Sequence, residues 1–171
     1  MTALGTNSDQ ATYSPTSPSG IVAGSQADLS WMEGVYKFFH QHPELSGAEE
    51  VTAQTIAKEL ENYPNWKITT DIGGHGITAV LENGEGPTVL MRADFDGLPV
   101  AEKTGVDYAS TYSQLNASGE RVATMHACGH DHHTTSLLGA MRILDAERAH
   151  WSGTVVALFQ PAEEASIGAH K

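Results

Sequence analysis

The sequence predicts an α/β fold, in which helices pack on a sheet that contains buried strands. Apolar residues recur at helical spacing in two stretches before residue 64, and three short stretches rich in β-branched or apolar residues follow. The run Thr88-Val89-Leu90-Met91 is nearly all apolar, which suits a strand covered on both faces in a layered structure. We therefore expect one α/β domain with a real core, preceded by a short tail.

The first predicted helix begins near Asp28 and stops by His42. Ser30 with Glu33 resembles a capping box at its start, and Pro43 restricts the backbone of the residue before it. The apolar stripe that this helix buries comprises Leu29, Met32, Tyr36 and Phe39.

A second capping pair, Ser46 and Glu49, predicts another helix that ends before Pro64. Its apolar face is formed by Ala53, Ile56 and Leu60. Two helices are therefore expected before any strand.

Strands are expected over residues 66–70, 77–81 and 88–93, and a glycine-containing turn at residues 82–87 joins the last two. A long irregular segment covers residues 102–120. After it, residues 154–159 form another buried strand. The helix before that strand is marked by an amphipathic set, Leu137, Leu138, Met141 and Leu144.

Charge and hydropathy exclude two classes of partner. Asp and Glu number 21 against 9 Lys and Arg, so the chain would repel phosphate backbones and we expect no nucleic acid partner. No apolar run approaches the roughly 18 residues that a membrane-spanning helix needs, so we expect no membrane association.

The single cysteine cannot form an internal disulfide, so an oxidising compartment would not stabilise this chain through disulfide bonds. Residues 1–27 are rich in Ser, Thr, Gly, Ala and Pro and have neither the basic start nor the apolar segment of a signal peptide. We interpret them as a disordered tail on a cytoplasmic protein whose folded part is residues 28–171.

Acidic residues follow two of the predicted strands. Asp94 and Asp96 stand at the end of one, and Glu163 and Glu164 follow the other. Ligands of open α/β sheets bind beyond the carboxyl ends of strands, so the two acidic clusters are expected to converge.

Cys128 and His130 lie in a dense stretch of chemically active residues, Met125-His126-Ala127-Cys128-Gly129-His130-Asp131. Side chains two residues apart in an extended or looped backbone point to the same side, so both can reach one ion. Thiolate and imidazole suit zinc, and the carboxylates nearby also tolerate manganese. The simpler interpretation is a buried small cysteine and a histidine that caps a helix.

The acidic residues also allow two interpretations. Glu163 and Glu164 would point opposite ways in an extended chain, so that one could bind metal while the other acts on water. They could equally be a solvated helix start, and Asp94 with Asp96 could form only a turn. Each signal taken alone favours the simpler interpretation, whereas their joint placement at strand ends favours a metal site.

Nucleophilic hydrolases are the competing enzyme class. A single cysteine near histidines fits a thiol nucleophile, but that mechanism leaves the paired carboxylates at two strand ends without a task. Serine hydrolysis is weaker still, because the sequence has no Gly-x-Ser-x-Gly elbow.

Four ordered motifs resemble those of the aminoacylase-like metallo-amidohydrolases, a group that includes hippurate hydrolases, auxin-conjugate hydrolases and N-acetyldiaminopimelate deacetylases and is related to carboxypeptidase G. The resemblance runs from about Leu29 to the end of the chain. The motifs are His40-Gln41-His42-Pro43-Glu44-Leu45-Ser46, Arg92-Ala93-Asp94-Phe95-Asp96-Gly97-Leu98-Pro99, Met125-His126-Ala127-Cys128-Gly129-His130-Asp131 and Phe159-Gln160-Pro161-Ala162-Glu163-Glu164.

This resemblance implies a zinc-exopeptidase-like three-layer α/β sandwich with a two-metal centre, holding Zn²⁺ or Mn²⁺. It implies hydrolysis of the amide bond of small N-acyl amino acids or related conjugates. By position, Cys128, His130 and Glu164 would be metal ligands and Glu163 the general base that also protonates the leaving amine. Asp96 would be the active-site aspartate that orients the centre. His126, His132, His133 and the histidines near Pro43 match no family ligand and are expected at the surface or behind the ligands.

The departures from the family pattern concern mainly length. Gly97 stands where the family usually has alanine, and the sequence ends at Lys171, whereas family members continue well beyond this point. The resemblance implies that the remaining part supplies further histidine ligands and a lid domain that often mediates dimerisation. We therefore expect the N-terminal portion of a catalytic domain, with weak metal binding and an unprotected sheet edge. A non-catalytic remnant that binds a metal or a partner is the alternative.

Overall fold

The computed structural model describes residues 29–170. Its α-helices are α2 (Leu29–Gln41), α3 (Glu50–Leu60) and α4 (His130–Ala146). Its strands are β1 (Lys67–Ile72), β2 (Gly76–Asn83), β3 (Thr88–Asp94), β4 (Ser113–Leu115), β5 (Arg121–Ala123) and β6 (Gly153–Gln160). Two 3₁₀ turns, η2 (Arg148–His150) and η3 (Gly168–His170), complete the described elements. The predicted tail, residues 1–27, and the predicted helix start at Asp28 lie outside the described residues.

The main sheet has the strand order β1-β2-β6-β3. Although β2 and β3 are consecutive in sequence, β6 inserts between them, antiparallel to β2 and parallel to β3. The parallel register pairs Asp94 with Gln160, the last residues of the two strands. Both strands therefore deliver the residues that follow them to the same edge of the sheet.

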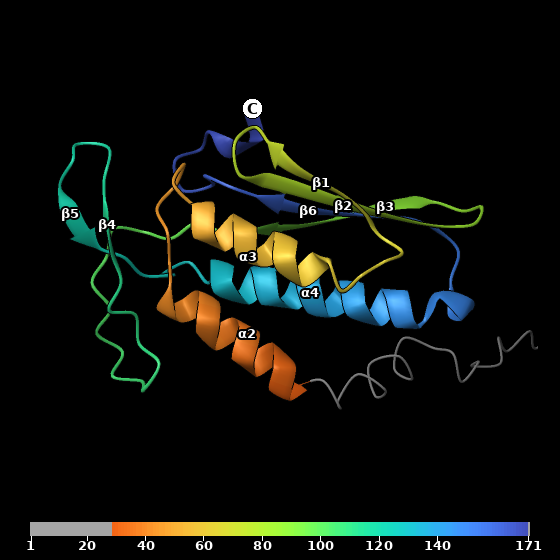
Figure 1. Cartoon of the computed structure of the whole chain (residues 1–171), viewed down its shortest axis with the longest axis horizontal. Helices are drawn as coiled ribbons and strands as arrows, with labels where there is room; N and C mark the ends of the chain where they lie inside the picture. Colours follow the sequence, from red (N-terminus) through yellow and green to blue (C-terminus); the bar gives the residue numbers. More distant parts are fainter. Residues whose placement is uncertain (1–28, 171) are drawn as a thin grey trace, which may run out of the picture.

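Helices α2, α3 and α4 lie together on one face of the sheet (Figure 1). Alternate residues of β6, including Val155, Ala157 and Phe159, are buried on that side. They join a core with apolar residues of all three helices, among them Phe39, Ile56, Leu60, Leu138 and Met141. The predicted α/β class is confirmed, and residues 29–170 supply the sheet and one helical layer of the predicted sandwich.

Strand β3 differs from its prediction. It pairs only with β6, so among the described strands it is an edge, and Val89 and Leu90 are 51% and 60% exposed. The expectation of a strand covered on both faces is therefore wrong for residues 29–170. The apolar run correctly indicated a strand, but residue type alone does not specify which elements lie beside it.

Both predicted capping boxes are also wrong. Ser30 lies inside α2, where Glu33 instead pairs with Lys37 at 2.7 Å. Glu49 precedes α3 without a side-chain capping bond. The start of α3 is capped by Glu44, whose carboxylate accepts hydrogen bonds from the backbone N–H of Val51 and Thr52 at 3.2 and 2.7 Å.

The remaining helix and strand predictions are confirmed within a few residues. The face of α3 that was predicted to be apolar buries Ile56 and Leu60, and α4 buries Leu137, Leu138 and Met141. The segment predicted as irregular contains the short hairpin strand β4. No helix within residues 29–170 is both long and apolar enough to cross a bilayer.

Candidate metal centre

The acidic residues after β3 and β6 converge, as the sequence predicted, and the structure places them at the start of α4. Asp96, two residues beyond β3, accepts a hydrogen bond at 3.0 Å from the backbone N–H of Glu164, four residues beyond β6. His130, the first residue of α4, lies between them. Gly129 makes this placement possible because its backbone is left-handed, with φ 80°, directly before the helix.

His130 is oriented by Asp96. Its Nδ1 donates to the Asp96 backbone oxygen at 2.8 Å and lies 3.2 Å from the carboxylate Oδ1. A histidine that donates through Nδ1 presents the lone pair of Nε2 to a ligand. This Nε2 faces carboxylates of the two strand ends, at 3.5 Å from Asp94 Oδ1 and 3.8 Å from both Glu163 Oε2 and Glu164 Oε1.

Asp96 is fixed in its ionised form. The side chain is buried, and burial by itself would raise its pKa. Hydrogen bonds from His130, from the Ser46 hydroxyl at 2.6 Å and from the Glu164 backbone outweigh that effect and lower the pKa to about 2. The same partners hold the carboxylate in one orientation.

Cys128, His130 and Glu164 form a compact set of donors. Their Sγ, ring nitrogen and carboxylate oxygen all lie within 4.8 Å of one another. The turn before α4 brings the side chains of Cys128 and His130 to Glu164, whereas the assignment of these residues as ligands of one ion stays a prediction. Soft sulfur, imidazole nitrogen and carboxylate oxygen together are a ligand chemistry that zinc accepts.

Two observations indicate that a cation fits this donor set. Glu164 Oε1 is buried and has no hydrogen-bond partner among the described residues, a costly state for a carboxylate unless a cation is present. Hydrogen bonding and charge repulsion from Glu164 raise the pKa of the Cys128 thiol. A catalytic thiol needs the opposite shift, so the metal-free site disfavours a cysteine nucleophile. The negative charge of the carboxylates that causes the shift is a charge that a bound cation would offset.

Glu163 and Glu164 do not point in opposite directions, in contrast to the prediction. Both carboxylates approach His130 Nε2 at 3.8 Å, because residues 163–166 form a turn and not an extended strand. The two side chains still differ in environment: 40% of Glu163 is exposed, compared with 18% of Glu164. Glu163 therefore lies on the open side of the site.

Asp94 and His133 form a second donor group with His130. His133 Nδ1 lies 2.6 Å from Asp94 Oδ1, and Arg92 approaches the other carboxylate oxygen at 3.0 Å. Burial would raise the pKa of Asp94, but these partners and His130 lower it. The contact between Asp94 and His133 was not predicted from the sequence.

The remaining histidines near the site differ in environment. His132 is exposed, as expected. His126 is buried, neither of its ring nitrogens has a hydrogen-bond partner among the described residues, and burial lowers its pKa to about 4. His40 is also buried and contacts Asp131 and Glu102. Of the two placements expected for these histidines, the surface is therefore excluded and the one behind the ligands is compatible with the structure; sequence could not decide between them, because an isolated histidine carries no periodic signal of burial.

Two further residues support the site, and both had been interpreted as helix caps. Ser46 donates to Asp96, and Glu49 accepts the backbone N–H of Ala162 at 2.7 Å, next to Glu163. The capping interpretation was wrong for both residues. It could not identify their partners, which lie 50 and 113 residues away.

Comparison with known proteins gives the same relationship as the motifs. Residues 90–171 match the peptidase family M20/M25/M40. The N-acetyl-L-cysteine deacetylase of Bacillus subtilis (strain 168) is 40% identical over 138 residues, which are 81% of this chain and 31% of that protein. IAA-amino acid hydrolase ILR1-like 2 of Arabidopsis thaliana is 39% identical over 149 residues, 87% of this chain and 32% of that protein.

A solved structure has the same fold. The Bacillus subtilis YXEP protein, described as a dinuclear metal binding peptidase from the M20 family, superposes with a TM-score of 0.73 at 36% identity. The match covers 85% of this chain and 38% of that chain. The chain spans about a third of the length of the curated relatives that it matches. The resemblance is confirmed: the chain is similar to amidohydrolases, deacetylases and a metal binding peptidase of the M20 family, and it covers only the N-terminal part of their length.

Proposed function

We propose that this chain supplies part of a divalent metal site that hydrolyses the amide bond of N-acyl amino acids or related conjugates. Cys128, His130 and Glu164 would be ligands, and the complete centre would hold two ions, Zn²⁺ or Mn²⁺. One observation carries the proposal: three donors of suitable chemistry lie within 4.8 Å of one another, and Oε1 of the donor Glu164 is buried with no hydrogen-bond partner within residues 29–170. The relatives named as a deacetylase and an amino acid hydrolase support the class of substrate.

A bound ion would polarise the amide carbonyl and make water more acidic. The chain's own residues would orient the ligand His130 and transfer a proton from the attacking water to the leaving nitrogen. Asp96 holds the Nδ1 proton of His130 and so keeps Nε2 available as a ligand atom. Glu163, on the open side, would accept a proton from the attacking water and return it to the leaving nitrogen.

Metal binding can be tested by measuring the zinc affinity of the purified chain and its thermal stability with and without zinc. Zinc is expected to raise the melting temperature, because a ligand that binds only the folded state stabilises it. Cys128→Ser and Glu164→Gln should each weaken zinc binding. The neighbouring Glu163→Gln is the matched control and should bind zinc nearly as well as the wild type. Equal zinc affinity of all four proteins would contradict the ligand assignment.

Activity is tested with N-acetyl-cysteine and N-benzoylglycine. Turnover that is abolished by a chelator and by Glu163→Gln supports the hydrolase. No turnover by a folded, zinc-bound chain supports the alternative of a metal-binding remnant. Activity that resists chelators but is destroyed by thiol alkylation would refute the metal mechanism.

A further inference from the structure

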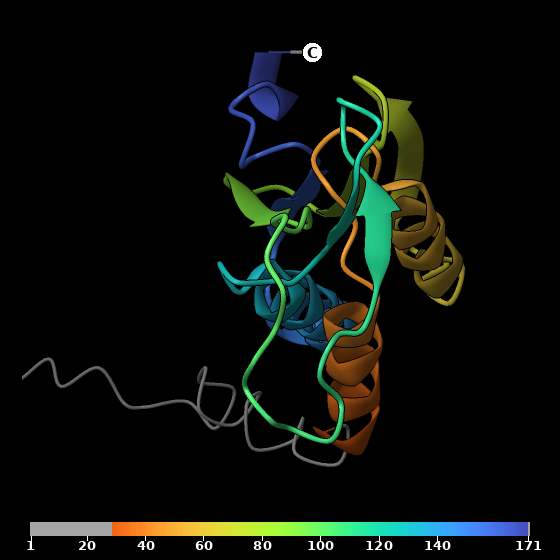
Figure 2. The same cartoon turned by 90° about the vertical axis from the view of Figure 1, so that its left-hand side faces the viewer.

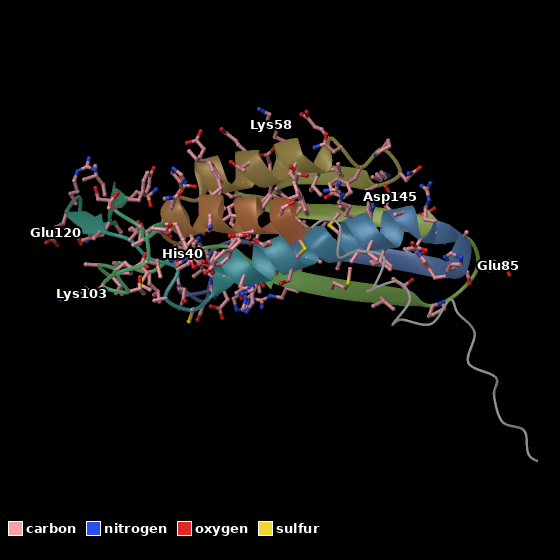
Figure 3. All side chains as sticks on the ribbon, turned by 90° about the horizontal axis from the view of Figure 1, so that it is seen from below. His40, Lys58, Glu85, Lys103, Glu120 and Asp145 are labelled. Atoms are coloured by element: carbon pink, nitrogen blue, oxygen red, sulfur yellow. The ribbon has the colours of Figure 1, made fainter. Side chains whose placement is uncertain are left out.

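His40 lies at the end of α2, next to the start of α4 (Figure 3), and none of the proposed catalytic steps uses it. Its ring is held between two carboxylates. Nδ1 lies 2.7 Å from Asp131 Oδ2, and Nε2 lies 3.1 Å from Glu102 Oε1. All three side chains are at least nine-tenths buried.

This geometry requires a protonated ring. Carboxylates only accept hydrogen bonds, whereas a neutral imidazole has one N–H and one lone pair, which would face a carboxylate oxygen. An imidazolium donates at both nitrogens and so satisfies Asp131 and Glu102 together. Burial would lower the pKa of His40, but hydrogen bonds to these two carboxylates outweigh it and raise the pKa above its ordinary value of 6.5.

Two basic groups near His40, His126 and Lys37, do not replace it as the cation between Asp131 and Glu102. Burial keeps the pKa of His126 at about 4, so that ring is neutral. Lys37 lies over the Tyr108 ring and pairs with Glu33. The titratable and charged groups around His40 are Tyr36 and Lys37 of α2, Glu102 and Tyr108 of residues 99–112, His126, and Asp131 and His132 of α4.

Each carboxylate organises a different segment. Glu102 accepts the backbone N–H of Ser110 and the hydroxyl of Thr104, and so fixes the fold of residues 99–112. Asp131 accepts the backbone N–H of His132 in the first turn of α4, directly after His130. Figure 2 shows residues 99–112 (green) running beside α2 and the start of α4. His40 therefore joins three segments at one buried point.

We propose that His40 is a positioning residue: as an imidazolium shared by Asp131 and Glu102, it fastens residues 99–112 and helix α2 to the first turn of α4, beside His130. If the proposed function holds, loss of this fastening should also weaken metal binding at His130. That effect rests on the proposed function, whereas the fastening itself does not. Since the folded-state pKa is raised, the fastening is complete below about pH 6.5 and weakens as the pH rises through that folded-state pKa.

Amide hydrogen exchange of Ser110, read by NMR, tests the fastening. In His40→Gln, one amide cannot donate to both carboxylates, so the Ser110 protection factor is expected to fall roughly ten- to a hundredfold. His42→Gln is the matched control: the His42 ring also packs against residues 99–112, at Tyr112, but its Nδ1 hydrogen-bonds to the backbone oxygen of Phe38, so this variant loses a ring contact without losing a bond to Glu102 or Asp131. Its Ser110 protection should equal that of the wild type.

The wild type provides a second test that does not depend on a variant folding. The His40 ring should titrate above pH 6.5, and Ser110 protection should fall with that titration. This pH dependence should be absent from His40→Gln, which a packing role alone does not predict. A neutral His40 ring at pH 6, or unchanged Ser110 protection in His40→Gln, overturns the proposal.

Zinc affinity separates this inference from the proposed function. If the wild type binds zinc, His40→Gln should weaken zinc binding more than His42→Gln does. Equal zinc affinities of the two variants would show that His40 does not position the metal ligands. If the wild type binds no zinc, the proposed function fails. The Ser110 protection data then still support or overturn the fastening by His40.

Discussion

Replacing Asp96 with asparagine tests whether a buried charge holds the strand ends together. The asparagine oxygen can still accept from the Ser46 hydroxyl and the Glu164 backbone N–H, which contact the same carboxylate oxygen in the wild type. The charge is lost, and the NH₂ group faces the His130 Nδ1–H, which then keeps only the Asp96 backbone oxygen as its acceptor. The variant therefore keeps the shape of the side chain and removes its ionic contacts.

The size of the effect follows from the pKa of Asp96, which is about 2 against an ordinary value of 3.8. The side chain is 1% exposed, so solvent screening is small. One pKa unit corresponds to about 1.4 kcal/mol, so ionised Asp96 stabilises the metal-free fold by about 2–3 kcal/mol at neutral pH. Because the folded-state pKa is depressed, this contribution is present above pH 3.8 and is lost as the pH falls towards 2.

Urea unfolding in the presence of a chelator measures this contribution. At pH 7, Asp96→Asn should lower the free energy of unfolding by about 2–3 kcal/mol, and the difference from the wild type should shrink as the pH is lowered through 3.8. Asp107→Asn, at an exposed aspartate, is the control and should have little effect. A stability equal to the wild type at pH 7, or a difference that does not change with pH, would refute the electrostatic explanation.

Three further predictions concern the elements around the site. Glu44→Gln should lower the free energy of unfolding by about 1–2 kcal/mol in urea, because Glu44 caps α3, whereas Glu85→Gln in an exposed turn should not. Gly129→Ala should lower the free energy of unfolding by about 1 kcal/mol, because its φ is positive, and should also weaken zinc binding. The control Gly119→Ala, at a φ of 76° far from the donors, should lower the free energy of unfolding by a similar amount and leave zinc affinity unchanged. Leu138→Ala should destabilise by about 2–5 kcal/mol in thermal unfolding, whereas Leu115→Ala, at a position 54% exposed, should change stability little.

The convergence of the two acidic strand ends could be predicted because it depends on a general rule. Residues 88–93 and 154–159 had the composition of buried strands, and parallel strands bring their carboxyl ends to one edge. Asp96 and Glu164 accordingly contact each other across 68 residues. The spacing of Cys128 and His130 could be interpreted for a different reason: the two residues are two positions apart, so their relative placement depends only on the local backbone.

What could not be predicted depends on partners that are distant in sequence. The orientation of Glu163 depends on a turn that the extended-chain interpretation did not include. The exposure of Leu90, which pairs with Val156 on the face away from the helices, depends on what covers that face of the sheet, and composition contains no information on that layer. The burial of His40 depends on carboxylates 62 and 91 residues away. In each case the residue type was compatible with several environments, and tertiary packing selected one.

Residues 40–49 show how a motif without a proposed ligand can still determine the geometry of the centre. His40 contacts Asp131 at the start of α4, and the Pro43 backbone oxygen accepts the Thr124 hydroxyl at 2.7 Å. The Glu44 backbone oxygen accepts the N–H of Gly97 at 2.6 Å. Ser46 donates to Asp96, and Glu49 accepts the N–H of Ala162. This one segment therefore contacts all three stretches that carry the donors, and its substitution should perturb metal binding although it contributes no ligand.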